Sequence, residues 1–109
     1  MKKAFILFFL FAVMSCSTKN ESVPPDLIPQ DSMVSIMVDI HLAEASMPAM
    51  QIYGEKMNEV ALEHYAHIYI LHHVTEEQFK TSHEYYLAHP DVYKDIYEQV
   101  VKSLQKMKP

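Results

Sequence analysis

The stretch QDSMVSIMVDIHLAEAS, residues 30–46, decides the fold because its apolar residues recur at the spacing of one helix face. Pro29 suits the first turn of a helix, and Pro48 is expected to end it. The stretch therefore predicts an amphipathic helix from Gln30 to Ser46 with one buried face. At about 100° per residue, that face carries Met33, Ile36, Met37, Ile40, Ala43 and the following Met47.

Three more helices are expected after this one, and the connection at residues 48–54 fits either a loop or a short irregular helix. The second helix runs from about Glu55 to His73. The third runs from Thr75 to about His89 and opens on TEEQ, residues 75–78, which has the form of a capping box. The fourth begins at Pro90 or Asp91, where proline fits the first turn, and ends near Lys106. Its apolar stripe contains Val92, Ile96, Val100 and Leu104, beside Tyr93 and Met107.

Length and composition agree with a small helical protein. The chain has 109 residues, enough for one domain, and its 50% hydrophobic content argues against wholesale disorder. A single glycine leaves few positions for turns with positive φ, which disfavours a turn-rich β protein. We therefore predict an all-α fold, a small bundle of about four helices forming one domain over residues 28–107. The net charge of −5 argues against nucleic acid as a partner.

The beginning of the chain has the features of an export signal. Lys2 and Lys3 precede an apolar run, residues 4–14, which is too short to span a bilayer as a helix. The run leads into VMSC, which resembles the lipobox of bacterial lipoproteins and ends at the only cysteine, Cys16. The resemblance predicts a signal peptide over residues 1–15, a lipidated Cys16 and a flexible tether over residues 16–27. An ordinary signal peptide or an uncleaved anchor is the alternative.

The residues after Cys16 indicate in which membrane, and on which face of it, the protein is expected to lie. In many Gram-negative lipoproteins an aspartate after the cysteine favours retention in the inner membrane, whereas this chain has Ser17. Surface-exposed lipoproteins of Bacteroidota often carry an acidic run there, which Lys19-Asn20-Glu21 matches poorly. We therefore expect a protein held on the outer membrane through its lipid, with its body facing the periplasm.

The first helix contains three ionisable residues that suggest a site. Asp39 falls opposite His41 on the helical wheel, so these two cannot pair locally, whereas Glu44 lies within the apolar face three residues after His41. One hypothesis is a partly buried carboxylate oriented by histidine, as a general base requires. The other, which we favour, is a polar contact that fixes helix packing. Asp39 is expected to face solvent or the end of another helix.

Histidines on the second helix extend this candidate polar cluster of His41, Glu44 and His64. Imidazole and carboxylate ligands suit zinc, but the spacing of His64 and His67 is a weak motif, and no cysteine is free to act as a ligand. The seven tyrosines and the methionines mostly fit core positions. We therefore expect a non-enzymatic interaction or assembly partner in the envelope, without a cofactor. A small metal- or ligand-binding module using His41, Glu44 and His64 is the alternative.

Three longer segments carry a family resemblance. They are PPDLIPQDSMVSIMVDIHLAEA (24–45), LHHVTEEQF (71–79) and EYYLAHPDVYKDIYEQVV (84–101). Their order and spacing resemble the domain of unknown function 4296 family, small helical lipoproteins of the Bacteroidota type. The resemblance covers about residues 24 to 104 and is poorest between Pro48 and Gly54. It implies a small, lipidated, all-helical envelope protein and carries over no activity.

Overall fold

The computed structural model describes residues 22–108, and all of the regular structure in this part of the chain is helical. The predicted signal peptide, Cys16 and residues 17–21 lie outside the described residues. The all-α prediction is confirmed. The helices are α2 (Gln30–Ala49), α3 (Glu55–Leu71), α4 (Glu76–Leu87) and α5 (Pro90–Lys106).

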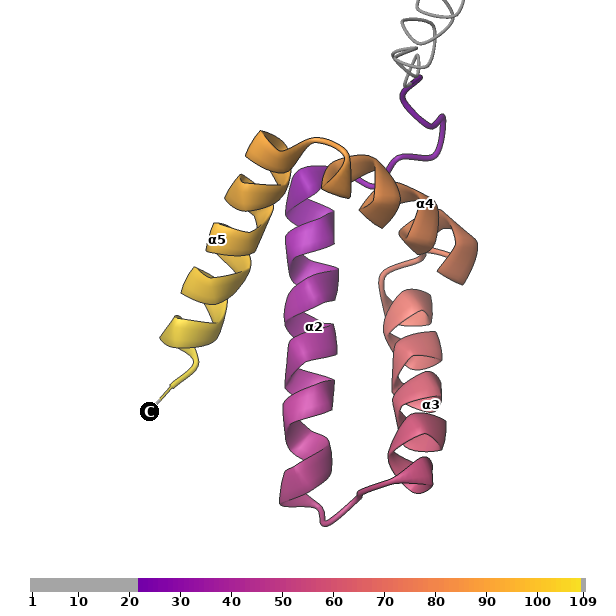
Figure 1. The fold of residues 1–109 in the computed structure, drawn as a ribbon, viewed down its shortest axis with the longest axis vertical. Coiled ribbons are helices and arrows are strands. Elements are labelled where there is room, and N and C mark those ends of the chain that lie inside the picture. Colours follow the sequence, from indigo (N-terminus) through magenta and orange to yellow (C-terminus); the bar gives the residue numbers. More distant parts are fainter. Residues whose placement is uncertain (1–21, 109) are drawn as a thin grey trace, which may run out of the picture.

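Helix α2 lies in the middle of the fold, with α3 on one side and α5 on the other (Figure 1). Helix α4 joins α3 to α5 across the end at which α2 begins. Both α3 and α5 pack against α2, and both also contact α4. Helix α2 is therefore the helix around which the core is built.

Helix α2 buries two of its sides. The predicted face is largely enclosed, and Met33 and Ile36 on that face are fully buried. Val34 and Val38 are also buried, although they lie on a different side of the helix. The apolar periodicity of the sequence indicates only the first of these sides, and the second arises because α2 lies between two neighbouring helices.

The prediction that Pro48 ends the first helix near Ser46 was wrong by most of a turn. Helix α2 continues to Ala49 with Pro48 inside its last turn. Proline lacks the N–H that would bond to the Glu44 carbonyl, but the ladder continues beyond it, since the Met50 N–H donates to the Ser46 carbonyl at 3.1 Å. So near a C-terminus, proline removes one bond without stopping the helix.

Helices α2 and α3 each end with a residue other than glycine in the left-handed conformation. Gln51 has a φ of 60° and His73 a φ of 57°. The backbone bonds run from Gln51 to Pro48 and from Ile52 to Met47 after α2, and from His73 to Ile70 and from Val74 to Tyr69 after α3. This double pairing is the Schellman motif, in which glycine is usual. The Schellman motif after α3 ends that helix at Leu71, two residues before the predicted boundary at His73.

The starts of α4 and α5 follow the sequence signals. The Thr75 hydroxyl accepts a hydrogen bond from the Gln78 N–H, and the Gln78 side chain accepts one from the Thr75 N–H, which completes the predicted capping box. Pro90 occupies the first turn of α5. Ile96 and Val100 on the predicted stripe of α5 are fully buried. No helix between residues 22 and 108 is long and apolar enough to cross a membrane.

Candidate functional site

The structure brings His41 and Glu44 together and adds Tyr65 from α3. The Tyr65 hydroxyl donates a hydrogen bond of 2.6 Å to Glu44 Oε1, while His41 Nδ1 lies 3.9 Å from Glu44 Oε2. The Glu44 side chain is 45% exposed. The carboxylate is therefore hydrogen-bonded to the tyrosine of the neighbouring helix, whereas the histidine on its own helix lies beyond hydrogen-bond distance.

The contact with Glu44 changes the chemistry of Tyr65. The hydrogen bond to Glu44, together with burial and the negative charges of Glu44 and Tyr69, raises the pKa of Tyr65 to about 12. The Tyr65 hydroxyl therefore stays protonated at neutral pH and keeps one carboxylate oxygen of Glu44 occupied. This arrangement fixes the packing of α2 against α3.

His64 is partly buried on α3, but in the described chain no hydrogen bond or ion pair joins it to His41 or Glu44. No three His, Cys, Asp or Glu side chains among residues 22–108 come close enough together to form a metal-ligand group. The structure thus assembles two of the three residues of the candidate cluster. The third polar partner is Tyr65 of α3, which donates to Glu44.

Asp39 makes a second contact between α2 and α3. Its Oδ2 lies 2.6 Å from Nε2 of His72, the residue that caps the end of α3. Of the two positions that the sequence left open for Asp39, the end of another helix is the one observed. The two pairs, Asp39 with His72 and Glu44 with Tyr65, run in opposite order along the two helices. They therefore set the antiparallel register of α2 and α3.

The most completely built polar feature fastens residues 24–29, here called the N-terminal arm, to α4. The Ile28 N–H donates to Ser82 Oγ at 3.0 Å, and the Tyr86 hydroxyl donates to the Ile28 carbonyl at 2.5 Å. The Gln78 Nε2 donates to the Asp26 carbonyl at 3.0 Å. Because Gln78, Ser82 and Tyr86 recur every four residues, they lie on one face of α4. We call these three residues the α4 ladder.

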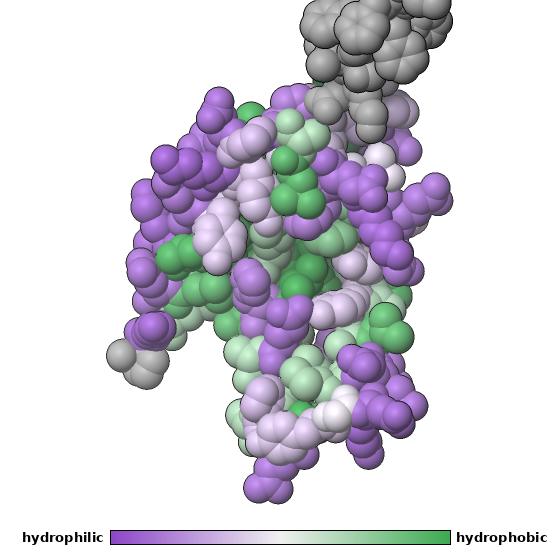
Figure 2. Space-filling view, in the orientation of Figure 1, coloured by the Kyte–Doolittle hydropathy of each residue, from purple (hydrophilic) through white to green (hydrophobic). Residues whose placement is uncertain are grey.

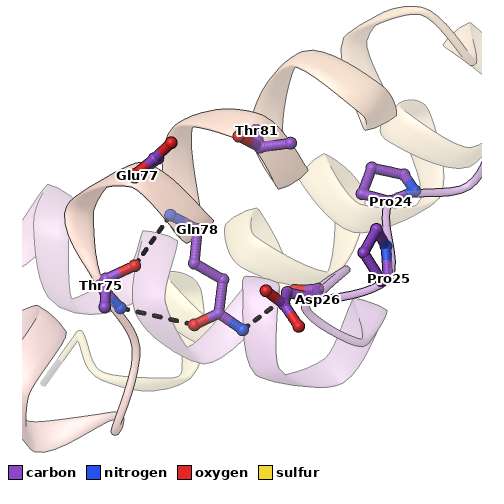
Figure 3. A pocket seen from close by; sticks show the side chains of 7 residues that line it. All are labelled: Pro24, Pro25, Asp26, Thr75, Glu77, Gln78 and Thr81. Carbon is purple, nitrogen blue, oxygen red and sulfur yellow. Dashed lines mark hydrogen bonds between the residues drawn. The ribbon is translucent and has the colours of Figure 1, made fainter.

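Gln78 performs two tasks at the start of the ladder. Figure 3 shows its side-chain oxygen directed to the Thr75 backbone and its side-chain nitrogen directed to the main chain of Asp26. A surface pocket lies between the arm and the start of α4, and Pro24 and Pro25 line the side of it opposite Gln78. One glutamine thus caps α4 and binds the arm to it.

The other contacts of the ladder are almost completely enclosed. Ile28 and Ser82 are each 1% exposed, and Tyr86 is 3% exposed. Burial raises the pKa of Tyr86, and the charges of Tyr85 and Asp31 raise it further. Both backbone polar groups of Ile28 therefore find their partners on α4, as buried backbone groups require.

The ladder extends the folded body toward the predicted tether. The sequence placed residues 16–27 in the tether and began the domain at residue 28. Leu27 packs against the core, and its N–H donates to the Pro24 carbonyl at 3.2 Å. The fixed part of the chain therefore begins several residues before residue 28.

The aromatic side chains mainly connect helices. The ring centroids of Tyr69 on α3 and Phe79 on α4 are 5.2 Å apart, and those of Phe79 and His83 are 5.7 Å apart. His83 in turn meets Tyr93 of α5 edge-on at 5.8 Å. These rings pack against the core or beside it, as the interpretation of the tyrosines as packing residues predicts.

The chain belongs to the family described as domain of unknown function (DUF4296), whose family model matches residues 24–109. The match begins at the first residue of the N-terminal arm, so it covers the arm and the helices α2 to α5. Comparison with curated proteins and with solved structures finds no match.

Proposed function

We propose that this protein is a lipoprotein of the cell envelope, attached to the membrane through lipid on Cys16, that acts as a non-enzymatic interaction or assembly partner. The lipobox-like VMSC supports the anchor. The observation that carries the proposal is the N-terminal arm, which the α4 ladder binds to the body. A protein that is held by its N-terminus needs this segment to stay attached.

The distance between anchor and body supports a position close to the membrane. Eight peptide units separate Cys16 from Pro24, and a fully extended chain of that length spans roughly 26–29 Å. A pull on the lipid acts first on the Pro24–Leu27 turn and then on the side-chain hydrogen bonds that bind Asp26 and Ile28 to α4. Helix α2 begins after these bonds and is thereby protected from unwinding.

The polar side chains singled out in the sequence favour a non-enzymatic role. Glu44 accepts a hydrogen bond from Tyr65, and Asp39 contacts His72, so both carboxylates serve the packing of α2 against α3. A tyrosine with a pKa of about 12 does not release its proton near neutral pH. The bond from Tyr65 thus occupies Glu44 Oε1, while Oε2 lies beside His41 at 3.9 Å.

The anchor is tested by labelling cells with radioactive palmitate. The full chain is expected to incorporate label, Cys16→Ser is expected to lose it, and Ser17→Ala, which keeps the cysteine, is expected to retain it. Incorporation into Cys16→Ser at the level of the unaltered protein would contradict lipidation at this position. Fractionation of the labelled cells then decides between the outer and the inner membrane.

The interaction role is tested by proximity labelling in the native envelope. The lipidated protein carrying a labelling enzyme at its C-terminus is compared with its Cys16→Ser form and with an unrelated lipoprotein of the same membrane. A reproducible set of envelope proteins that only the lipidated form labels would support the role. Identical labelling by all three would contradict it.

The contact between His41 and Glu44 is the observation that favours the alternative, a metal- or ligand-binding module. Zinc binding there would require a further ligand, for which His64 is the candidate on α3. A rise in the melting temperature on adding zinc that Glu44→Gln abolishes would support the alternative. A non-enzymatic partner without a metal predicts no rise.

A further inference from the structure

Helix α5 lies at the edge of the fold, and one of its sides has no neighbouring helix in the described part of the chain. Figure 1 shows α2 on one side of α5 and no helix on the other. Residues at alternating spacings of four and three share one side of a helix and form the seam for a second helix. Four residues of α5 have this spacing, and we call them the α5 seam: Pro90, Lys94, Tyr97 and Val101. All of them except Val101 are exposed.

A shallow groove of about 490 Å³ lies beside the seam at the corner between α4 and α5. Its apolar lining consists of Leu87 at the end of α4 and of Pro90, Tyr93 and Tyr97 on α5. Leu87 and Tyr97 are each 49% exposed, and the Tyr97 ring stacks on Tyr93 with 6.5 Å between the centroids. On the face seen in Figure 2, hydrophilic surface follows the outer edge of α5, and hydrophobic surface lies inside that edge over its later turns.

Two opposite charges line the same groove without pairing. Lys94 and Glu98 are both exposed and lie four residues apart on α5. Neither forms an ion pair or a hydrogen bond within the described chain. Lysine before glutamate is the weaker order for a pair within one helix, which agrees with this observation. Both charges are therefore open to a partner across the groove.

We propose that two copies of this protein pair through α5 in antiparallel orientation, with the two-fold axis between Lys94 and Tyr97. Lys94 of each copy then lies over the Tyr97 ring of the other copy and beside its Glu98, so each copy gives one cation–π contact and one ion pair. Pro90 of each copy lies opposite Val101 of the other. The dipoles of the two helices run in opposite directions, which is favourable.

A second copy is the occupant because the charges of the groove are complementary to themselves. A two-fold interface repeats every contact, and the pairing of Lys94 with Glu98 is repeated on both sides of the axis. A parallel pairing would set lysine against lysine and glutamate against glutamate, which is unfavourable. A surface of one charge sign would attract one of these residues and repel the other.

This pairing goes beyond the proposed anchor, because it rests on α5 alone. It is tested with a carbodiimide, which joins an amine to a carboxylate only where the two groups touch. Full chains with natural and with heavy nitrogen are mixed in detergent micelles and cross-linked. A link between chains contains both isotopes, whereas a link within one chain contains one. We expect a link between Lys94 and Glu98 that contains both isotopes.

Charge reversal tests the register, with sedimentation equilibrium of the full chain as the measurement. Glu98→Lys and Lys94→Glu are each expected to raise the dissociation constant of the dimer at least about tenfold, because two attractive pairs become repulsive. Combining both changes is expected to restore the dimer, since the pairs re-form with opposite polarity. Asp95→Lys is the matched control, because Asp95 is exposed on the opposite side of α5 and should change the dissociation constant little. Circular dichroism verifies that each variant remains helical.

Several results would overturn the pairing. A full chain that stays monomeric, or a Lys94–Glu98 link found only within single chains, excludes it. A dimer that Glu98→Lys weakens no more than Asp95→Lys, or that the double reversal does not restore, contradicts the antiparallel register. A link from Lys94 to a different protein in intact cells assigns the groove to that protein. The Cys16→Ser form is expected to pair as well, so failure of this pairing is distinguishable from failure of the anchor.

Discussion

Replacing Tyr86 by phenylalanine removes one hydroxyl from the most enclosed contact of the α4 ladder. The ring keeps its place among buried side chains, since Tyr86 is 3% exposed and packs with the core. The change deletes the 2.5 Å hydrogen bond to the Ile28 carbonyl. Because Ile28 is 1% exposed, water cannot replace the lost donor without opening the structure.

The expected cost follows from that burial. A buried acceptor that loses its only partner costs about 1–3 kcal/mol of stability, more than the net value of an ordinary hydrogen bond. In a domain of this size each kcal/mol lowers the melting temperature by about 4–8 °C. Tyr86→Phe is therefore expected to melt at least about 4 °C below the unaltered protein.

The neighbouring residue provides the control. Tyr85 is only partly buried, its ring stacks near His89, and its hydroxyl donates no hydrogen bond in the described chain. Tyr85→Phe should therefore change the melting temperature little. Thermal unfolding of both variants is followed by far-ultraviolet circular dichroism. Equal melting temperatures for the two variants would refute the conclusion that the ladder stabilises the arm.

Three further predictions concern α2 and α3. Gln51→Gly is expected to raise the free energy of unfolding by up to about 1 kcal/mol, because glycine adopts a positive φ without steric cost. The control Met50→Gly, at a φ of −92°, should lower the free energy of unfolding. Both are measured by urea titration. A double-mutant cycle on Asp39 and His72 should give a coupling free energy of about 0.5 kcal/mol, because Asp39 is 41% exposed and solvent screens the pair. A coupling free energy of zero would contradict the contact. Tyr65 should contribute stability that is complete below pH 10 and lost as the pH rises toward 12, because its pKa rises from 10.0 to about 12 on folding and the folded chain holds the proton more tightly. Tyr65→Phe should make the alkaline fall in melting temperature shallower, and an unchanged fall would count against the raised pKa.

The helices themselves could be predicted because their signals are local. The capping box at Thr75 and Gln78 lies within a few consecutive residues, and so does the apolar stripe of α5. Pro90 marks the start of α5 for the same reason. Each of these signals depends on contacts between residues three or four apart, which the sequence shows directly.

The second buried side of α2 could not be predicted in this way. The row of Val34 and Val38 is buried only because another helix lies beside it, and one-dimensional periodicity does not show how many neighbours a helix has. The left-handed ends at Gln51 and His73 were missed for a different reason. Neither residue is glycine, so the usual signal for such a helix end is missing.

The candidate site was predicted in part. The wheel separated Asp39 from His41 and placed Glu44 beside His41, as observed. Tyr65 and His72 come from a helix 21 and 33 residues away, so only packing reveals them. The α4 ladder is more remote still, since 54 residues separate Ile28 from Ser82. A serine at a core position of α4 was the available signal, because a buried hydroxyl requires a partner.

Central to the proposed function is that the segment following the tether belongs to the folded body. Hydrogen exchange at the Ile28 amide measures this directly, because that N–H is buried and donates to Ser82 Oγ. If the arm is fixed, this amide exchanges as slowly as amides in the middle of α2, and Ser82→Ala makes it exchange faster. Exchange of the Ile28 amide at the rate of an unfolded peptide in the unaltered protein would contradict the proposal.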